Sequence, residues 1–241
     1  MTFEIPEIKE ITPCEIHGNQ NMFINGRCGV CIEIETHKKN EIIITDIHKK
    51  MQHNAGIPQR FRDSTFDNYI CDTNEQQRIK TTLMNFEFDK NLLFLGNTGT
   101  GKTHLANSLL NKKIKNKKFT NEELDDIKKN PKFNPTTSYY YVKFYNLMDL
   151  KIKKFDTFKK MINSKFLIID EVGTSDSENK NNLLFEIIDE RYDNLKHTML
   201  ISNLSQDGLK AIISPATYSR IKENFIIFDV GWEDYRLRKN K

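Results

Sequence analysis

The chain has 241 residues, of which 37% are hydrophobic and 29% charged, and its formal net charge at pH 7 is +4. This length allows one full-sized α/β domain with a small appendage, and sixteen Phe with eight Tyr supply enough core material to exclude whole-chain disorder. Four Cys are too few for a disulfide scaffold, and no apolar run approaches the roughly 18 residues of a membrane span. The N-terminal residues do not have the pattern of a secretory signal. We therefore expect a cytoplasmic protein without a membrane partner.

The first 33 residues carry two short metal-binding signatures. Cys14 and His17 are separated by two residues, as are Cys28 and Cys31, and a loop of ten residues joins the two pairs. Two such pairs supply the four ligands of a tetrahedral Zn²⁺ site, and glycines at 18, 26 and 29 allow tight turns around them. A module of this size buries too little surface to fold without a metal. We therefore predict a structural zinc site in a module spanning 1–33, with three ordinary thiols and an unrelated His as the alternative.

Residues 34–56 predict a helical linker, and residues 57–241 predict a single core domain. From residue 57 onward, short apolar runs alternate with helical patterns, which is typical of a parallel sheet covered by helices on both faces. The runs lie at 92–95, 139–144, 166–169, 199–201 and 225–228. The polar stretch 111–135 predicts an exposed insert with a short helix near 121–129.

A phosphate-binding loop follows the first apolar run. It has the pattern GxxxxGK[ST] and lies between a predicted strand and a predicted helix. Glycines let such a loop wrap a phosphate with its backbone N–H groups, the helix N-terminus adds positive potential, the lysine reaches the β- and γ-phosphates, and the hydroxyl binds Mg²⁺. The predicted nucleotide-binding residues are Gly96, Asn97, Thr98, Gly99, Thr100, Gly101, Lys102 and Thr103.

Acidic and polar residues follow two later strands. Asp170 and Glu171 end the apolar run 166–169, and Asn203 follows the run 199–201. A carboxylate at such a strand end holds Mg²⁺, so Asp170 joins Thr103 as a predicted magnesium ligand, and Glu171 is placed to polarise the attacking water. Asn203 is placed to orient that water. The alternatives are an ordinary acidic turn and a turn asparagine.

Positive charge is concentrated in two parts of the chain. Residues 111–160 hold fourteen Lys against six acidic residues, and the tail adds Arg236, Arg238, Lys239 and Lys241. Such asymmetry indicates a polyanionic partner such as nucleic acid. A chain that is rich in Lys throughout, with no such partner, is the alternative.

Several segments resemble the DnaC-type replicative helicase loaders, a group within the AAA+ ATPases. The matching segments are GIPQRFR (56–62), FDNY (66–69), the phosphate loop extended by HLA (104–106), IDEVG (169–173), ISN (201–203), SRI (219–221) and WEDYR (232–236). They span residues 56–236. The phosphate loop alone is generic, whereas the 57–69 stretch and the 232–236 ending are much more specific to this group.

The resemblance implies an α/β fold with an AAA+ P-loop core, a five-stranded parallel sheet and ATP hydrolysis. It identifies Asn203 as the first sensor of the nucleotide state and Arg220 as the arginine that reaches the nucleotide of a neighbouring subunit, which implies a homo-oligomer. The implied catalytic set is Glu171, Asn203 and Arg220. Because the sequence ends soon after Arg236, we expect no C-terminal helical lid, and loaders of this group lack one too. A surface arginine is the alternative for Arg220.

The resemblance also places a helical DNA-binding insert at 146–162. There Lys151 and Lys154 would contact phosphates and Phe155 would stack on a base of single-stranded DNA. The residues themselves allow another interpretation. Leu147, Leu150, Phe158 and Met161 form an apolar helical stripe, which Phe155 extends, and most of the lysines then belong to a solvated face.

The sequence therefore predicts an ATP- and Mg²⁺-dependent loader of a hexameric replicative helicase onto single-stranded DNA. Several such loaders carry an N-terminal zinc module that docks on the helicase, so the module at 1–33 favours this function. The first alternative is a transposition helper ATPase of the IstB type that acts on duplex DNA. A P-loop small-molecule kinase agrees less well with Asp170, Glu171, Asn203 and Arg220. A zinc-bearing adapter with a decayed ATPase site agrees less well with the intact Lys102, Thr103, Asp170 and Glu171.

Overall fold

The computed structural model describes residues 14–17, 23–24, 27–174, 178–235 and 237. The chain divides into two compact units, one made of residues 1–47 and 119–132 and the other of residues 48–118 and 133–241. Two glycines of the predicted metal module and the basic tail lie outside the described residues, namely Gly18, Gly26, Arg236, Arg238, Lys239 and Lys241.

The larger unit contains a parallel sheet of five strands in its described part, with the order β4-β5-β6-β3-β7. The strands are β3 (Asn91–Leu95), β4 (Tyr139–Lys143), β5 (Phe166–Val172), β6 (His197–Ser202) and β7 (Phe225–Asp229). Each coincides with one of the apolar runs of the sequence. The predicted α/β fold with a five-stranded parallel sheet is confirmed.

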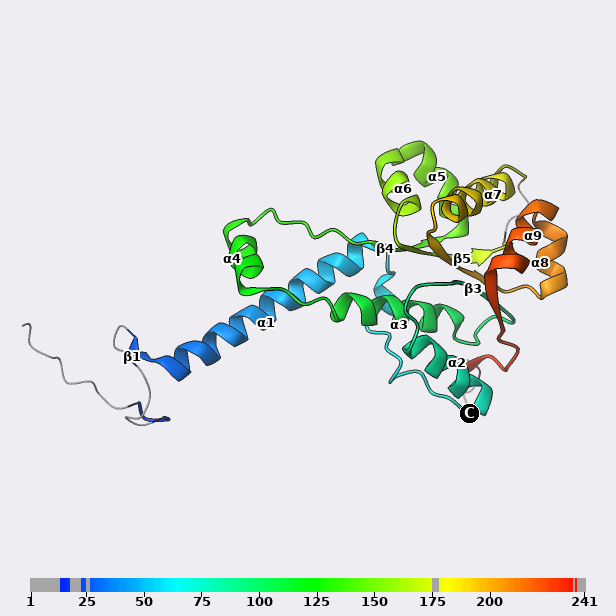
Figure 1. Ribbon diagram of the computed structural model, residues 1–241. Helices are drawn as coiled ribbons and strands as arrows, with labels where there is room; N and C mark the ends of the chain where they lie inside the picture. The colour runs from blue at the N-terminus through cyan, green and yellow to red at the C-terminus, as the bar shows by residue number, and fades with distance from the viewer. Residues whose placement is uncertain (1–13, 18–22, 25–26, 175–177, 236, 238–241) are drawn as a thin grey trace, which may run out of the picture. The chain divides into compact units, whose positions relative to one another are not determined.

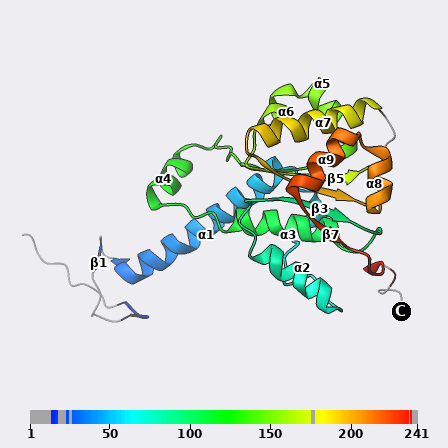
Figure 2. The same ribbon diagram turned by 45° about the vertical axis from the view of Figure 1, so that its right-hand side comes forward.

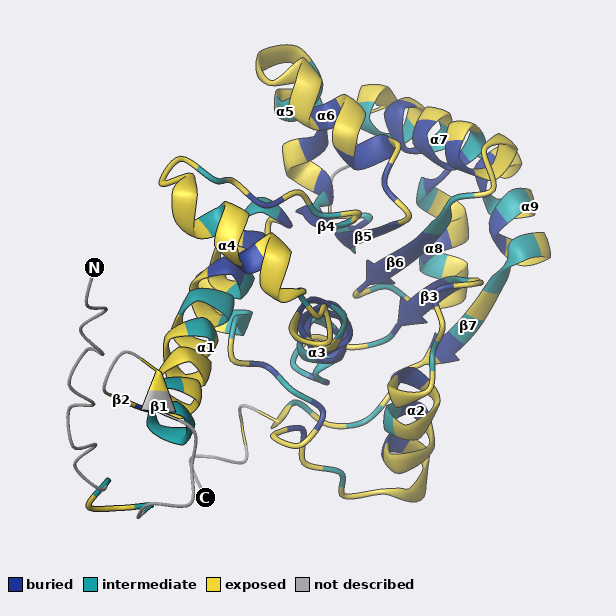
Figure 3. Ribbon diagram, turned by 60° about the vertical axis from the view of Figure 1, so that its left-hand side comes forward, coloured by how far each residue is buried: buried dark blue, intermediate teal, exposed yellow. Residues whose placement is uncertain are grey.

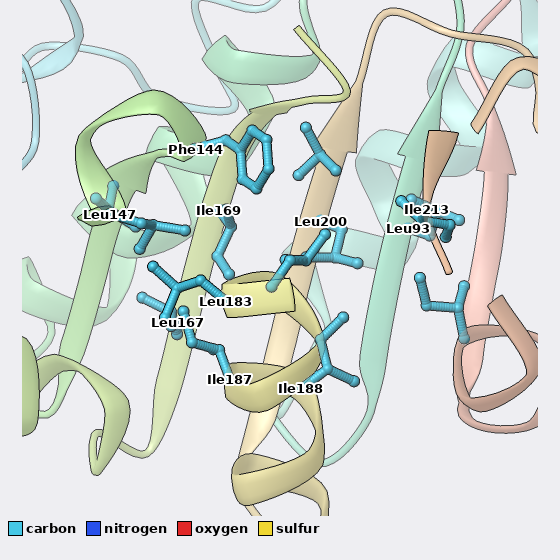
Figure 4. Close-up of a cluster of buried hydrophobic side chains, with 14 of the residues drawn as sticks. Leu93, Phe144, Leu147, Leu167, Ile169, Leu183, Ile187, Ile188, Leu200 and Ile213 are labelled. Carbon is cyan, nitrogen blue, oxygen red and sulfur yellow. The ribbon is translucent and has the colours of Figure 1, made fainter. Parts of the chain in front are cut away.

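One face of the sheet carries the main hydrophobic core. Leu183 and Ile187 of helix α7 (Glu178–Asp193) pack over Leu167 and Ile169 of β5 and Leu200 of β6, and all five side chains are buried (Figure 4). The other helices on this face are α5 (Leu147–Lys153), α6 (Phe155–Ile162), α8 (Gln206–Ile212) and α9 (Pro215–Asn224) (Figure 1).

The opposite face is covered by α2 (Asn74–Met84) and α3 (Lys102–Lys115) (Figure 2). Strand residues alternate between the two faces, so Leu93 belongs to the α7 side and Phe94 to the α3 side. Helix α2 begins with a capping box in which Thr73 and Gln76 satisfy each other's backbone N–H groups. The central strands β5, β6 and β3 are therefore buried on both faces, which explains their continuous apolar runs.

The insert before β5 differs from the prediction. The sequence predicts one helical insert over 146–162, whereas the structure has α5 and α6 with a break at Lys154, after the short 3₁₀ turn η2 (Phe144–Asn146). The backbone of Lys154 has φ −139° and ψ 55°, outside the helical region. Apolar spacing continues across the break, so periodicity alone does not reveal it.

The smaller unit begins with a short antiparallel pair, β1 (Phe23–Ile24) with β2 (Arg27–Cys28). Helix α1 (Gly29–Asn54) starts directly after β2, five residues before the predicted linker helix, and continues into the larger unit. Helix α4 (Asn121–Lys129) forms where a short helix is predicted. It is mostly exposed, and a capping box between Thr120 and Glu123 starts it (Figure 3). Within the described ranges, none of the helices combines the length and the apolar character that crossing a membrane requires.

Candidate nucleotide site and metal cluster

The phosphate-loop residues connect β3 to α3 and line a cavity of about 570 Å³. The cavity is lined by the loop from Thr98 to Thr103, by Asp170 and Glu171 at the end of β5, and by Asn203 after β6. These residues come from three strand ends of one parallel sheet, which is where such sheets bind ligands. The structure therefore brings most of the predicted nucleotide residues together. Gly96 and Asn97 lie outside the lining.

Lys102 is buried at the first turn of α3 with 4% of its surface exposed. Its ammonium donates to the carbonyl oxygens of Gly96 (2.7 Å) and Asn97 (2.5 Å) and to Oγ1 of Thr100 (3.2 Å). These bonds hold the Lys102 ammonium against the loop, next to the backbone groups with which such loops bind phosphates. Gly96 and Asn97 thus serve the loop through their carbonyl groups.

Asp170 is the centre of a buried hydrogen-bond network at one end of the cavity. Its Oδ2 accepts from Thr103 Oγ1 (2.7 Å) and from the hydroxyl of Tyr141 (2.8 Å), and its Oδ1 accepts from the backbone N–H of Glu171 (2.7 Å). Burial raises the pKa of Asp170, while these three donors oppose the rise. Burial and the nearby carboxylate also raise the pKa of Tyr141, which keeps its hydroxyl a donor.

This donor set fits a magnesium ion. Mg²⁺ prefers oxygen ligands and is usually held by one or two protein oxygens together with waters and phosphate oxygens. The Thr103 hydroxyl and the Asp170 carboxylate lie in contact and line the same cavity as the phosphate loop. Both are therefore suited to the role that the sequence predicts for them.

Glu171 occupies an unusual backbone position and forms an ion pair. Its φ is +62°, in the left-handed region that few non-glycine residues adopt. Its Oε1 accepts from Nζ of Lys143 at 2.9 Å, and the two side chains are 32% and 31% exposed. Because β4 and β5 run in register with Lys143 opposite Asp170, the lysine reaches the acid on the next residue.

Arg220 lies apart from the cavity. It is on α9, where it pairs with Asp189 of α7 and its guanidinium lies 5.0 Å from the centre of the Tyr192 ring. It is absent from the described residues that line the nucleotide cavity of its own chain. The structure thus brings Glu171 and Asn203 to the cavity and leaves Arg220 outside its lining. About a third of the Arg220 side chain is exposed.

The segment 57–69 packs along α3 at the other end of the cavity. Asn111 of α3 donates to the carbonyl oxygens of Phe61 and Ser64, both at 2.8 Å. The ring of His104 contacts Thr65 O at 3.0 Å, and burial lowers the pKa of this histidine. Tyr69 lines the cavity beside these residues and lies 5.7 Å, centre to centre, from the His104 ring. These contacts show the structural role of the 57–69 motif, which packs on α3 and forms one wall of the cavity.

The four predicted zinc ligands form one cluster in the smaller unit. Their ligand atoms all lie within 4.8 Å of one another. Cys14 and Cys31 have Sγ atoms 3.7 Å apart, and His17 Nδ1 lies 3.6 Å from Cys14 Sγ, 3.8 Å from Cys28 Sγ and 3.5 Å from Cys31 Sγ. A tetrahedral Zn²⁺ with Zn–S bonds of about 2.3 Å requires sulfur atoms about 3.8 Å apart. The cluster therefore has the chemistry and the dimensions of a structural zinc site.

The candidate DNA-binding residues lie on α5 and α6. Phe155 is 50% exposed, so its predicted place in the apolar stripe is wrong, while Leu147, Phe158 and Met161 are buried as that stripe requires. The break at Lys154 rotates Phe155 out of the stripe. Lys159 Nζ lies 4.9 Å from the centre of the Phe155 ring, and Lys151 pairs with Glu186 at 2.8 Å.

Sequence reasoning missed three residues of the site. Tyr141 and Lys143 lie two residues apart on β4 and so share one face, a pattern visible in the sequence. Only the β4–β5 register shows that this face meets Asp170 and Glu171. Trp232 lines the cavity from the segment after β7, where the sequence gives a motif but no role.

Comparison with known proteins agrees with the resemblance seen in the motifs. The chain is 26% identical over 192 residues to the replicative helicase loader DnaC of Buchnera aphidicola subsp. Acyrthosiphon pisum, covering 76% of this chain and 73% of the relative. It is 28% identical over 193 residues to a putative ATP-binding protein of insertion sequence IS5376 from Geobacillus stearothermophilus, covering 77% and 71%. A search of family models returned no match.

The fold also matches a solved structure of the same group. A crystal structure of the DnaC helicase loader superposes with a TM-score of 0.54 at 23% identity and covers 71% of this chain and 99% of that one. The AAA+ P-loop fold is therefore confirmed. Over three quarters of its length, the chain is similar both to DnaC-type loaders and to ATP-binding proteins of insertion sequences.

Proposed function

We propose that this chain is an ATP-dependent loader of a hexameric replicative helicase onto single-stranded DNA. One observation carries the ATPase part of the proposal: Thr103 of the phosphate loop donates at 2.7 Å to the buried carboxylate of Asp170, inside a cavity that also holds Lys102 and Glu171. The similarity to DnaC supports the loader part.

In this proposal the cavity binds ATP with Mg²⁺. Lys102 and the backbone N–H groups of the loop hold the phosphates, and Thr103 and Asp170 hold the ion, which neutralises charge on the phosphate oxygens. Glu171 polarises the attacking water once its carboxylate is available, and Asn203 orients that water. The part of the cavity lined by Tyr69 and the 57–69 segment then receives the nucleoside.

Arg220 acts between subunits in this proposal. Its distance from the cavity of its own chain and its partly exposed guanidinium support a role in trans. A cation supplied by the neighbouring subunit stabilises charge that develops on the transferred phosphoryl group. The active form is then a homo-oligomer in which one subunit completes the site of the next.

The zinc cluster gives the proposed loader its docking module. Zn²⁺ held by Cys14, His17, Cys28 and Cys31 stabilises a segment that is too short to fold alone. The partner that we propose for this module is the helicase, since a separate N-terminal docking module suits a protein that must grip another and later release it.

Helices α5 and α6 supply the proposed single-strand contact. Phe155 offers an exposed ring for base stacking, and Lys154 is exposed beside it. Lys151 forms an exposed ion pair with Glu186, so this pair must break before Lys151 can contact a phosphate.

A transposition helper ATPase is the second candidate. The similarity to the IS5376 protein is as extensive as the similarity to DnaC, which favours it. Such a helper would bind duplex DNA and recruit a transposase instead of a helicase. The zinc module favours the loader, because it adds a docking device outside the ATPase core.

A helicase-loading assay tests the proposal. Single-stranded circles coated with single-strand-binding protein are incubated with the replicative helicase of the source organism, this chain and ATP, and helicase retained on the DNA is measured. We expect retention with the wild type and with Lys115→Ala, an exposed lysine of α3, and none with Lys102→Ala. Tight duplex binding with no helicase retention by the wild type would instead support the transposition helper.

A further inference from the structure

The segment that follows β7 packs against the phosphate loop. The backbone N–H of Val230 donates to the carbonyl of Leu95 at 2.7 Å, immediately before the loop. The indole Nε1–H of Trp232 donates to the carbonyl of Thr100 at 2.8 Å, and the backbone N–H of Tyr235 donates to the carbonyl of Gly99 at 3.0 Å. Residues 230–235 therefore form a strap that is hydrogen-bonded to the loop at Gly99 and Thr100 and to Leu95 just before it.

Two loop glycines show how closely this strap approaches. A Cβ atom added at Gly96 would lie 2.3 Å from the carbonyl oxygen of Val230, and one added at Gly99 would lie 1.8 Å from Oδ1 of Asp234. Both glycines also have positive φ, 125° and 80°. The absence of side chains at these two positions is thus required by the strap as well as by the loop conformation.

The strap also reaches the nucleotide cavity itself. Trp232, Glu233 and Tyr235 line the same cavity as Lys102 and Thr103. The Trp232 side chain both lines the cavity and donates a hydrogen bond to the loop, so it can transmit the effect of a bound ligand to the loop backbone.

The bonds to Thr100 and Gly99 have a geometric consequence. In a trans peptide the C=O and the N–H of the next residue point in opposite directions. The Thr100 carbonyl accepts from the indole at 2.8 Å and more weakly from the Tyr69 hydroxyl at 3.4 Å, and holding it there turns the Gly101 N–H the other way. Holding the Gly99 carbonyl on Tyr235 does the same for the Thr100 N–H. These are N–H groups of the kind that phosphate loops present to an anion.

We infer that Trp232 is a positioning residue of the nucleotide site, which fixes the orientation of phosphate-binding N–H groups through the Thr100 carbonyl. This inference rests on the proposed function, because it assumes that the cavity binds a nucleotide. The strap follows β7 and bonds directly to the loop, so it orders the phosphate site from within the same domain.

The inference predicts that Trp232 matters for phosphates and not for the nucleoside. Trp232→Phe keeps an aromatic ring and removes the donor. Isothermal titration with ADP, with pyrophosphate and with adenosine, each with Mg²⁺, is the test. One net hydrogen bond of about 1 kcal/mol corresponds to about fivefold in Kd. We expect ADP and pyrophosphate to bind about five- to tenfold more weakly and adenosine to bind as in the wild type.

The control is Tyr218→Phe, which loses a side-chain hydrogen bond from Gln206 of 3.0 Å outside the cavity. It should leave all three affinities unchanged. Equal weakening of adenosine and ADP, or no change with any ligand, would overturn the role of Trp232. A wild-type chain that binds none of the three ligands would instead refute the proposed nucleotide site.

A second measurement uses the wild-type chain and therefore does not require that a variant folds. The chain has a single Trp, so the ¹⁵N-labelled wild type gives one indole N–H signal in a proton–nitrogen NMR spectrum. Pyrophosphate carries no base, so a shift of this signal on its addition reports an effect of the phosphate groups on the Trp232 indole. We expect a shift that saturates with the Kd of pyrophosphate. Bound pyrophosphate with an unmoved indole signal would contradict the inference.

Discussion

Lys143 and Glu171 form an ion pair of 2.9 Å at the edge of the nucleotide cavity, between neighbouring parallel strands. The hydrogen bond to Glu171 raises the pKa of Lys143, so the lysine stays charged throughout the physiological range. Any stability that this partly exposed pair contributes is fully present below the ordinary lysine pKa of 10.5 and is lost as the pH rises through the raised value. In this arrangement the carboxylate proposed to polarise water is held by a cation.

Replacing Lys143 should therefore release Glu171. We expect Lys143→Met to raise ATP turnover of the chain alone by about two- to fivefold, since an exposed pair of this kind contributes about 1 kcal/mol or less. Steady-state phosphate release measures this. Lys165→Met, an exposed lysine at the opposite end of β5, serves as the control and should leave turnover unchanged. A large loss of turnover in Lys143→Met would mean that the lysine assists hydrolysis and does not restrain it.

Arg220 provides a test of action between subunits. Arg220→Ala should keep the ATP affinity of the single chain, because Arg220 lies outside the cavity, and should lower turnover of the assembly on the order of 10³-fold. Lys222→Ala on the same helix is the matched control.

A mixing experiment separates a role in trans from a local effect. Arg220→Ala subunits retain a nucleotide site, and Lys102→Ala subunits retain the arginine. Mixing the two inactive variants should restore part of the ATP turnover if the arginine completes the neighbouring site. Turnover that stays at the level of the separate variants would place Arg220 outside the reaction.

The sequence predicts the sheet well because the three central strands β5, β6 and β3 are buried on both faces and all five strands are apolar runs. It fails where the local backbone departs from a regular helix. The break at Lys154 leaves the apolar spacing of 146–162 intact, so the stripe interpretation puts Phe155 in the core, whereas the structure has it exposed. The contacts of Trp232 with Thr100 and of Lys143 with Glu171 join residues far apart in the chain, and only strand register and chain path reveal them.

Phe155 and Phe158 form a matched pair for the DNA-binding proposal. Phe155→Ala removes a half-exposed ring, so we expect little change in stability and weaker binding of single-stranded DNA, by about 1–3 kcal/mol if one base stacks on it. Phe158→Ala removes a buried ring and should lower the free energy of unfolding by about 3–5 kcal/mol. Fluorescence anisotropy with a labelled oligonucleotide and chemical denaturation measure the two effects.

The lysines of these helices have a separate, electrostatic test. Lys151→Glu with Lys154→Glu should weaken single-strand binding and flatten its dependence on salt, because fewer phosphates are neutralised. Lys90→Glu with Lys222→Glu changes net charge equally at exposed positions outside 111–160 and is the control. Equal losses in both double variants would indicate a general charge effect and no specific DNA surface.

The zinc proposal is tested by metal content. The wild type should carry one Zn²⁺ per chain, and Cys28→Ser should lose it, because Cys28 supplies one of four ligand atoms in the cluster. Cys71→Ser, the cysteine outside the cluster, should retain the metal. Inductively coupled plasma mass spectrometry of the purified variants gives the stoichiometry. A wild type without zinc, or unchanged zinc in Cys28→Ser, would contradict the site.

Native mass spectrometry of the chain mixed with the replicative helicase of its source organism, with ATP and with ADP, tests the central proposal most directly. We predict a stoichiometric complex whose stability depends on the nucleotide and which Cys28→Ser abolishes while Cys71→Ser preserves it. The absence of a complex in either nucleotide, together with tight binding of duplex DNA, would contradict the loader and support the transposition helper.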